Sequence, residues 1–161
     1  MLEDTPAHDP ILFIDAVHPT MATKICCGWI TCALEGKKGV DKPIATTASR
    51  TRVNIIGAIE LNTMTVTSEF VETVNADTIS SFFGKLKAGY PQAEKLHIIL
   101  DQAGYHRSQA VKEAALSHHI ELHYLPPYSP NLNPIERLWK VMNEQVRNNV
   151  VFESAKAFRE Q

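Results

Sequence analysis

Three carboxylates in this sequence stand where they could act together as ligands of divalent metal ions. Asp15 and Asp101 each close an apolar run, which begins at Ile11 in the first case and at Leu96 in the second. Such runs are typical of buried strands, and neighbouring parallel strands would bring both acids to one edge of a sheet. Two adjacent carboxylates repel each other, so the pattern indicates a shared proton or a bound cation. Either aspartate taken alone would equally fit a turn that follows a strand.

Glu136 is the third candidate ligand, although a purely structural role also fits it. Asn133, Pro134 and Glu136 match a helix start with Asn as the N-cap, Pro at the first position and Glu at the third. The apolar stripe of this predicted helix consists of Ile135, Leu138, Trp139, Met142 and Val146. That stripe would pack against the core, so Glu136 lies on the opposite, polar face of the helix, from which its carboxylate can reach the two strand ends.

Three carboxylates with open coordination positions suit Mg²⁺ or Mn²⁺, because these ions prefer oxygen ligands and bind through substrate phosphates as well. The sequence therefore predicts that Asp15, Asp101 and Glu136 are both metal ligands and catalytic residues. Two ions, roughly 3.5 to 4 Å apart, would support phosphoryl transfer without a covalent enzyme intermediate.

The elements that must position these acids can be read from the hydrophobic pattern. Residues 11–15, 52–60, 65–71, 96–101 and 120–125 are expected to be strands, with the second and third forming a hairpin. Helices are expected over 75–88, after Asp101, from near Asn133 and around 152–158, where the last one would be cut short at Gln161. Parallel crossovers together with a hairpin require a mixed sheet. We predict a single α/β domain over residues 1–161, with an RNase H-like fold and a mixed five-stranded sheet flanked by helices.

Composition limits the classes of protein to which the chain can belong. With 161 residues, 44% of them hydrophobic, the chain can bury one core. No apolar stretch approaches the roughly 20 residues of a membrane helix, and no secretory signal is recognisable, so we expect a cytoplasmic protein without a membrane partner. The three cysteines lie within one short segment, which is not typical of a disulfide framework.

The formal net charge of −2 does not by itself indicate a nucleic-acid partner. A local basic stretch is nevertheless a candidate DNA-binding loop, since it could contact phosphates. Its basic residues are Lys37, Lys38, Lys42, Arg50 and Arg52. The alternative is an ordinary solvated loop.

Three sequence blocks resemble the mariner-superfamily transposases, and in particular their bacterial insertion-sequence branch. The blocks are Phe13 to His18, Ile99 to His106 and Leu125 to Trp139, and the last of them is the most specific. Between Asp101 and Glu136 lie 34 residues, the same number that separates the second and third acids in many family members. Gln102 and Asn131 depart from the family, in which many members have Asn and Asp at these positions.

The resemblance implies a DDE catalytic domain that cleaves DNA at transposon ends and joins the freed strand to target DNA. It implies Mg²⁺ or Mn²⁺ as cofactor, double-stranded DNA as partner, a homodimer, and action at the bacterial nucleoid. His106, Gln102, His18 and Asn133 are expected to support the acids. The helix-turn-helix modules usual in this family are not expected within this chain, which has ten residues before the first strand.

Two alternatives to this function stay open. Another two-metal nuclease of the same fold, such as an RNase H or a junction resolvase, would use the same acids. An inactive transposase remnant could persist as a DNA-binding or dimerising module. A zinc site is not expected, because no paired Cys-x-x-Cys spacing is present. The residues considered for zinc are His97, His118, His119, His123, Cys26, Cys27 and Cys32.

Overall fold

The computed structural model describes residues 9–26, 43 and 45–161, and these divide into two compact units. The first unit comprises residues up to His18 together with Val53–Trp139, and the second comprises Pro19–Arg52 and Lys140–Gln161. Every strand of the sheet belongs to the first unit.

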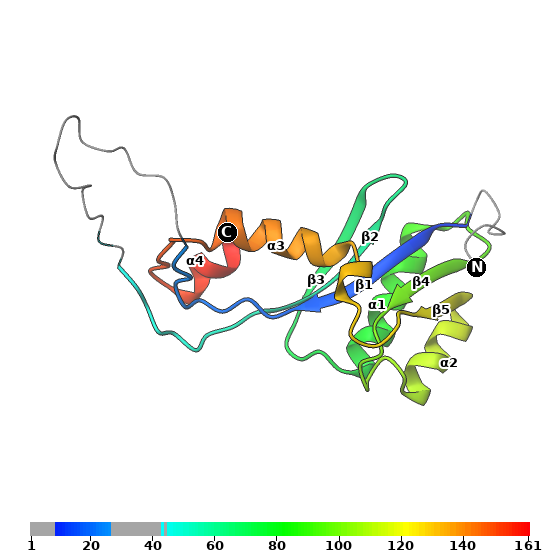
Figure 1. Ribbon diagram of the computed structural model, residues 1–161. Helices are drawn as coiled ribbons and strands as arrows, with labels where there is room; N and C mark the ends of the chain where they lie inside the picture. Colours follow the sequence, from blue (N-terminus) through cyan, green and yellow to red (C-terminus); the bar gives the residue numbers. More distant parts are fainter. Residues whose placement is uncertain (1–8, 27–42, 44) are drawn as a thin grey trace. The chain divides into compact units, whose positions relative to one another are not determined.

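A five-stranded mixed sheet forms the first unit, as the sequence predicts (Figure 1). The strands are β1 (Ile11–Val17), β2 (Asn54–Glu60), β3 (Thr65–Val71), β4 (Leu96–Leu100) and β5 (Ile120–Tyr124), in the spatial order β3-β2-β1-β4-β5. β1 pairs with β2 antiparallel and with β4 parallel, and β4 pairs with β5 parallel. The sheet therefore combines the hairpin with the crossover connections that the sequence pattern requires.

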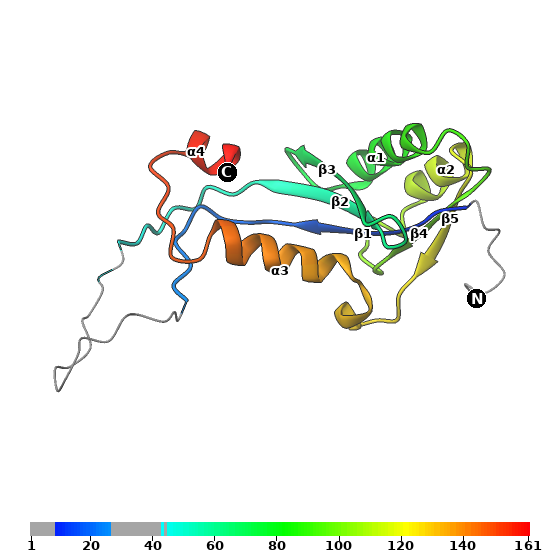
Figure 2. The ribbon, with the colours of Figure 1, turned by 90° about the horizontal axis from the view of Figure 1, so that it is seen from above.

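Two helices cover one face of this sheet (Figure 2). They are α1 (Ala76–Gly89) and α2 (Gln109–Ser117), and each begins at a side-chain cap, Asn75 for α1 and Ser108 for α2. The core lies between these helices and the sheet. Its members include Leu12, Ile14, Ile56, Ile98, Leu100, Phe82, Phe83 and Val111. Alternate residues of β1 and β4 face this core, so the residues between them face the other side of the sheet.

The other side of the sheet carries the first turns of α3 (Ile135–Val146) (Figure 2). A 3-10 turn over Pro130–Leu132 leads into this helix. Ile135 and Trp139 are buried, whereas Glu136 is exposed, in agreement with the apolar stripe predicted from the sequence. In the described part of the chain, no helix is long and apolar enough to cross a membrane.

The second unit has its own contacts. Arg147 donates hydrogen bonds to Thr20 Oγ1 (3.0 Å) and to Asn143 Oδ1 (2.6 Å). Asn149 exchanges two hydrogen bonds with the backbone of Cys26. The short helix α4 (Ala155–Glu160) carries Phe158, whose ring lies edge-on to that of Phe152 at 5.0 Å. These contacts give the second unit a small core of its own.

Gly57 on β2 permits the close approach of α3 to the sheet. A Cβ atom at this position would lie 2.5 Å from Cη2 and 2.7 Å from Cζ2 of Trp139, and 3.2 Å from Cδ1 of Ile135. Gly57 is also the register partner of Asp15. The packing of Trp139 on a bare backbone therefore sets the start of α3, and with it Glu136, beside the strand that carries Asp15.

We expect Gly57→Ala to destabilise the chain by about 1–3 kcal/mol, because its methyl group would overlap the indole of Trp139. Gly89→Ala is the matched control, since nothing lies within 4 Å of a Cβ atom there. Denaturant unfolding measures both. The double variant Gly57→Ala with Trp139→Phe should lose less free energy of unfolding than the two single variants lose together. Equal stability of Gly57→Ala and the parent chain would show that the indole is not held against β2.

Candidate active site

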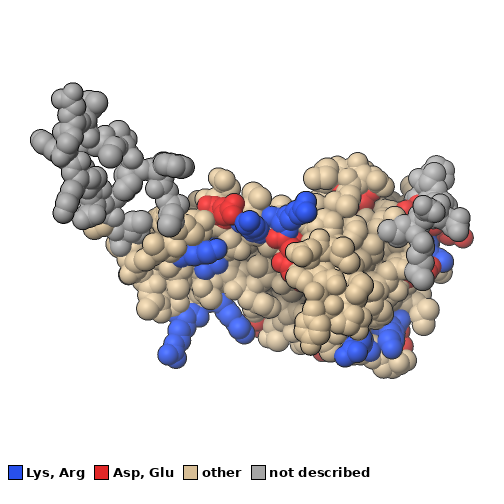
Figure 3. Space-filling view, viewed as in Figure 1, with Lys and Arg blue, Asp and Glu red and all other residues tan. Residues whose placement is uncertain are grey.

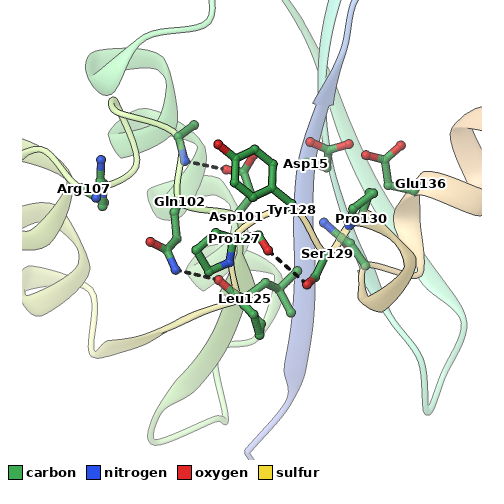
Figure 4. Close-up of a pocket in the computed structure, with 13 residues that line it drawn as sticks. Asp15, Asp101, Gln102, Arg107, Leu125, Pro127, Tyr128, Ser129, Pro130 and Glu136 are labelled. Atoms are coloured by element: carbon green, nitrogen blue, oxygen red, sulfur yellow. Dashed lines mark hydrogen bonds between the residues drawn. The ribbon is translucent and has the colours of Figure 1, made fainter.

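One cavity of about 460 Å³ collects the predicted acids on the sheet face that carries α3 (Figure 4). Asp15, Asp101 and Glu136 all line it, together with the predicted supporting residues Gln102 and Asn133. The remaining lining residues are Ala103, Arg107 and the segment from Leu125 to Pro130. The three acids come from a strand, a loop and a helix, so only the folded chain brings them to one cavity.

Asp15 and Asp101 share a face of the sheet because of the β1–β4 register. The last parallel pair is Phe13 with Ile99, and each aspartate lies two residues beyond its member of that pair. Side chains two residues apart on a strand point to the same face, so both carboxylates lie opposite the core. The predicted end of the first strand is wrong: β1 continues to Val17, because β2 pairs with it as far as Ile55. Asp15 therefore sits within a strand, and only Asp101 follows a strand end.

Asp101 is held by two donors on one of its oxygens. Oδ1 accepts the backbone N–H of Ala103 at 3.0 Å and lies 2.7 Å from Nδ1 of His106. His106 is 1% exposed, and burial lowers the pKa of its imidazole despite the nearby carboxylate. A neutral His106 donates its Nδ1–H to Asp101. This bond orients the carboxylate and leaves its second oxygen to the cavity, which supports the predicted auxiliary role of His106.

Gln102 and Asn133 donate hydrogen bonds to backbone carbonyls near the cavity. Gln102 Nε2 donates to the carbonyl of Leu125 (2.9 Å), and Asn133 Nδ2 donates to the carbonyl of Ile14 (3.1 Å). The second bond ties the entry of α3 to the residue before Asp15. The helix cap that the sequence allowed as an alternative role for this segment is not formed, because Asn133 Oδ1 accepts no hydrogen bond and the Asn133 N–H donates to the carbonyl of Pro130. The Asn133 amide points toward β1 instead, so capping does not account for Glu136.

The electrostatics of the cavity favour a bound cation. The pKa of Asp15 is raised from 3.8 to about 7, first by burial, then by the negative charges of Glu136 and Asp101. A hydrogen bond from the side chain of Trp139 acts in the opposite direction. Three convergent oxygen ligands whose mutual repulsion a divalent ion would relieve are a suitable donor set for Mg²⁺ or Mn²⁺.

Other predicted site residues lie elsewhere. His18 is exposed, contacts Asn54 Oδ1 through Nδ1 (2.9 Å), and does not line the cavity. Arg50 and Arg52 are exposed in the second unit. The other members of the predicted DNA-binding loop, Lys37, Lys38 and Lys42, lie outside the described residues. On the face drawn in Figure 3, basic side chains are scattered among acidic ones.

Two cavity residues were not singled out from the sequence. Arg107 is an exposed cation that follows His106 directly. Tyr128 is fully exposed and has a φ of 56°, a left-handed conformation that is uncommon for a residue with a side chain. Such conformations concentrate at functional sites. The run Pro126, Pro127, Tyr128 is typical of a stiff loop, but nothing in the sequence shows that the ring lies at a cavity.

A model of one protein family covers nearly the whole chain. The family is described as DDE superfamily endonuclease, and it matches residues 10–159. The chain is also 24% identical over 149 residues to the insertion element IS630 uncharacterized 39 kDa protein of Shigella sonnei. That alignment covers 92% of this chain and 42% of the relative.

Several solved structures with a similar fold are complexes of Mos1 transposase. One is the Mos1 transposase paired-end complex with left transposon end, with a TM-score of 0.69, 17% identity, and coverage of 96% of this chain and 46% of that one. Another is the Mos1 mariner paired end complex with Mn, with a TM-score of 0.68, 16% identity, and coverage of 94% and 46%. These similarities confirm the predicted RNase H-like fold. The chain spans less than half the length of each of these relatives.

The raised pKa of Asp15 predicts how stability depends on pH. Its folded pKa of about 7 lies above the ordinary value of 3.8, so the contribution of Asp15 is fully present below 3.8 and lost as the pH rises through about 7. We expect the melting temperature of the metal-free chain to fall across this window, and Mn²⁺ to raise it more at pH 8 than at pH 5.

The variant Asp15→Asn should remove this part of the pH dependence and most of the Mn²⁺ effect. Asp77→Asn, an exposed aspartate in the first turn of α1, is the matched control and should behave as the parent chain. Thermal unfolding followed by circular dichroism from pH 4 to 8 makes the comparison. Parallel pH profiles for Asp15→Asn and the parent would contradict the electrostatic interpretation.

Proposed function

The chain belongs to the DDE superfamily endonuclease family, and on this premise we propose that it is the catalytic domain of a transposase. In this proposal it cleaves DNA strands at the ends of a transposable element and transfers them to target DNA. The observation that carries the proposal is the convergence of Asp15, Asp101 and Glu136 on one cavity. The similarity to an insertion-element protein and to Mos1 transposase supports the choice of substrate.

Asp15, Asp101 and Glu136 would hold two Mg²⁺ or Mn²⁺ ions. When bound, the ions supply activation of an attacking oxygen and stabilisation of the leaving oxygen. The protein contributes rigid placement. Asp15 is fixed within β1, His106 and the Ala103 amide orient Asp101, and the packing of Trp139 on Gly57 sets the start of α3.

Arg107 and Tyr128 are suited to bind the DNA itself. Arg107 offers a cation for a backbone phosphate at the rim of the acidic cavity. The exposed ring of Tyr128 offers a face on which a base can stack. We propose double-stranded DNA, both transposon end and target, as the partner, and a homodimer as the active form, in keeping with the paired-end complexes of Mos1. We also propose the bacterial cytoplasm, at the nucleoid, as the place of action.

The two alternatives make different demands on this cavity. A ribonuclease H or a junction resolvase would place the same acids on an RNA–DNA hybrid or on a branched duplex. An inactive remnant would keep the fold without turnover. The match to an insertion-element protein favours the transposase, and cleavage assays with plain duplex, hybrid and branched substrates separate the three possibilities.

Glu136→Gln should abolish cleavage while the fold is retained. We expect a melting temperature close to that of the parent, because Glu136 is exposed, and a loss of about 10²-fold or more in nicking of supercoiled plasmid with Mn²⁺. Glu144→Gln, which removes an exposed carboxylate farther along α3, is the matched control and should cleave normally. Wild-type cleavage by Glu136→Gln would show that Glu136 is not a ligand.

Tyr128→Ala should weaken binding of duplex oligonucleotides that end in unpaired bases. Loss of one stacked base corresponds to about 1–3 kcal/mol, or roughly five- to 150-fold in dissociation constant. Tyr128→Phe keeps the ring and should bind as the parent does. Fluorescence anisotropy at fixed salt measures the binding, and equal affinities for Tyr128→Ala and Tyr128→Phe would rule out stacking.

A further inference from the structure

A second group of metal-ligand side chains lies outside the catalytic cavity. Within the part of the chain that the structure describes, the ligand atoms of His97, Glu121 and His123 all lie within 4.8 Å of one another. None of the three lines the cavity of Asp15 and Asp101. His97 lies on β4, four residues before Asp101, which follows the end of that strand; four residues of extended chain span about 13 Å.

The parallel register of β4 and β5 brings these residues together. His97 is the register partner of Glu121, and His123 is the partner of Ile99, one step farther along the same face. The alternate residues Leu96, Ile98, Ile120 and Leu122 pack toward the core. The three polar side chains therefore share the opposite face, at the edge of the sheet that β5 forms. Local spacing could not reveal this group, because 26 residues separate the two histidines in sequence.

The distances are close to those that one ion requires. Nδ1 of His97 lies 3.0 Å from Nε2 of His123. Oε2 of Glu121 lies 4.0 Å from the His97 nitrogen, and Oε1 of Glu121 lies 3.8 Å from the His123 nitrogen. A tetrahedral ion with bonds of about 2.0–2.1 Å would set each of these separations at about 3.3 Å. The imidazoles must open by a few tenths of an ångström, and Glu121, whose side chain is 46% exposed, must turn so that its carboxylate approaches both nitrogens.

The donor set selects a class of metal. Two imidazoles and one carboxylate suit Zn²⁺ and its neighbours in the first transition row, whereas Mg²⁺ prefers oxygen ligands alone. His97 is 8% exposed and forms the inner wall, while Glu121 faces outward. Lys95 competes with an ion for the carboxylate, because its Nζ lies 2.9 Å from Oε2 of Glu121.

We propose that His97, Glu121 and His123 form a binding site for one divalent transition-metal ion of the zinc class, distinct from the catalytic carboxylates. The ion joins the edge strand β5 to β4 and keeps at least one coordination position open to solvent. β5 runs directly into Leu125 and the proline-rich segment of the catalytic cavity. The ion therefore stabilises β5, the strand that leads into the proline-rich segment.

Metal binding is measured on the full chain, prepared without a histidine tag, by competition of Zn²⁺ with a chromogenic chelator. Excess Mg²⁺ is present to occupy the catalytic acids, and Cys26, Cys27 and Cys32 are replaced by serine to remove thiol ligands. We expect one Zn²⁺ per chain and a rise in melting temperature of about 5–10 °C at a hundredfold excess over the dissociation constant. Visible absorption of the Co²⁺ form reports the geometry independently.

Four variants test which residues bind the ion. Glu121→Gln and His123→Gln should each weaken Zn²⁺ binding by about tenfold or more. Lys95→Gln should strengthen it about two- to fivefold, because the competing cation is removed. His119→Asn is the matched control: it removes an exposed histidine whose φ of 55° asparagine tolerates, and it should leave binding unchanged.

The outcomes separate this site from the catalytic one. Binding that survives Asp101→Asn but is lost in Glu121→Gln and His123→Gln supports the proposal, whether or not the chain cleaves DNA. Binding that is lost in Asp101→Asn, or that Glu121→Gln and His123→Gln leave unchanged, overturns it. The absence of any stoichiometric Zn²⁺ binding in the serine-substituted chain also overturns it.

Discussion

The contact between Trp139 and the backbone of Gly57 is the constraint on which the placement of Glu136 beside Asp15 depends. A side chain at residue 57 would occupy the volume of the indole, so the helix and the strand can meet only where one of them is bare. Asp15 is the register partner of Gly57, and a hydrogen bond from the Trp139 side chain partly offsets the burial that raises the pKa of Asp15. The same indole thus bears on both the placement of α3 and the electrostatics of Asp15.

The folded chain keeps three acids together at a cost, and the surrounding hydrogen bonds show how that arrangement is maintained. His106 and a backbone amide hold Asp101, and Asn133 ties the approach to α3 to the carbonyl of Ile14. These bonds act on backbone and on single oxygens, so they do not neutralise the charge of the site. A divalent cation would relieve the repulsion that remains between the three carboxylates, which supports the proposed metal site.

Much of this arrangement could be predicted from the sequence. The apolar runs before Asp15 and Asp101 marked the sheet, and the stripe through Ile135 and Trp139 marked the exposed side of α3. The end of β1 could not be predicted, because it depends on how far β2 pairs along it. Asn133 looked like a helix cap, yet a tertiary bond to Ile14 takes its amide. Pairing across β4 and β5 likewise hides the His97 group, since register is not visible in local spacing.

Asp15 lies inside a strand that is paired on its side toward β2 both before and after it, at Ile14 with Ala58 and at Ala16 with Ile56. Its backbone has no freedom to shift, and its short side chain has only two torsions. Glu136 stands at the first turn of a helix and has one torsion more. In the proposed metal complex, a change of ion radius would therefore be taken up by the Glu136 side chain, while the β1 backbone that carries Asp15 stays in place.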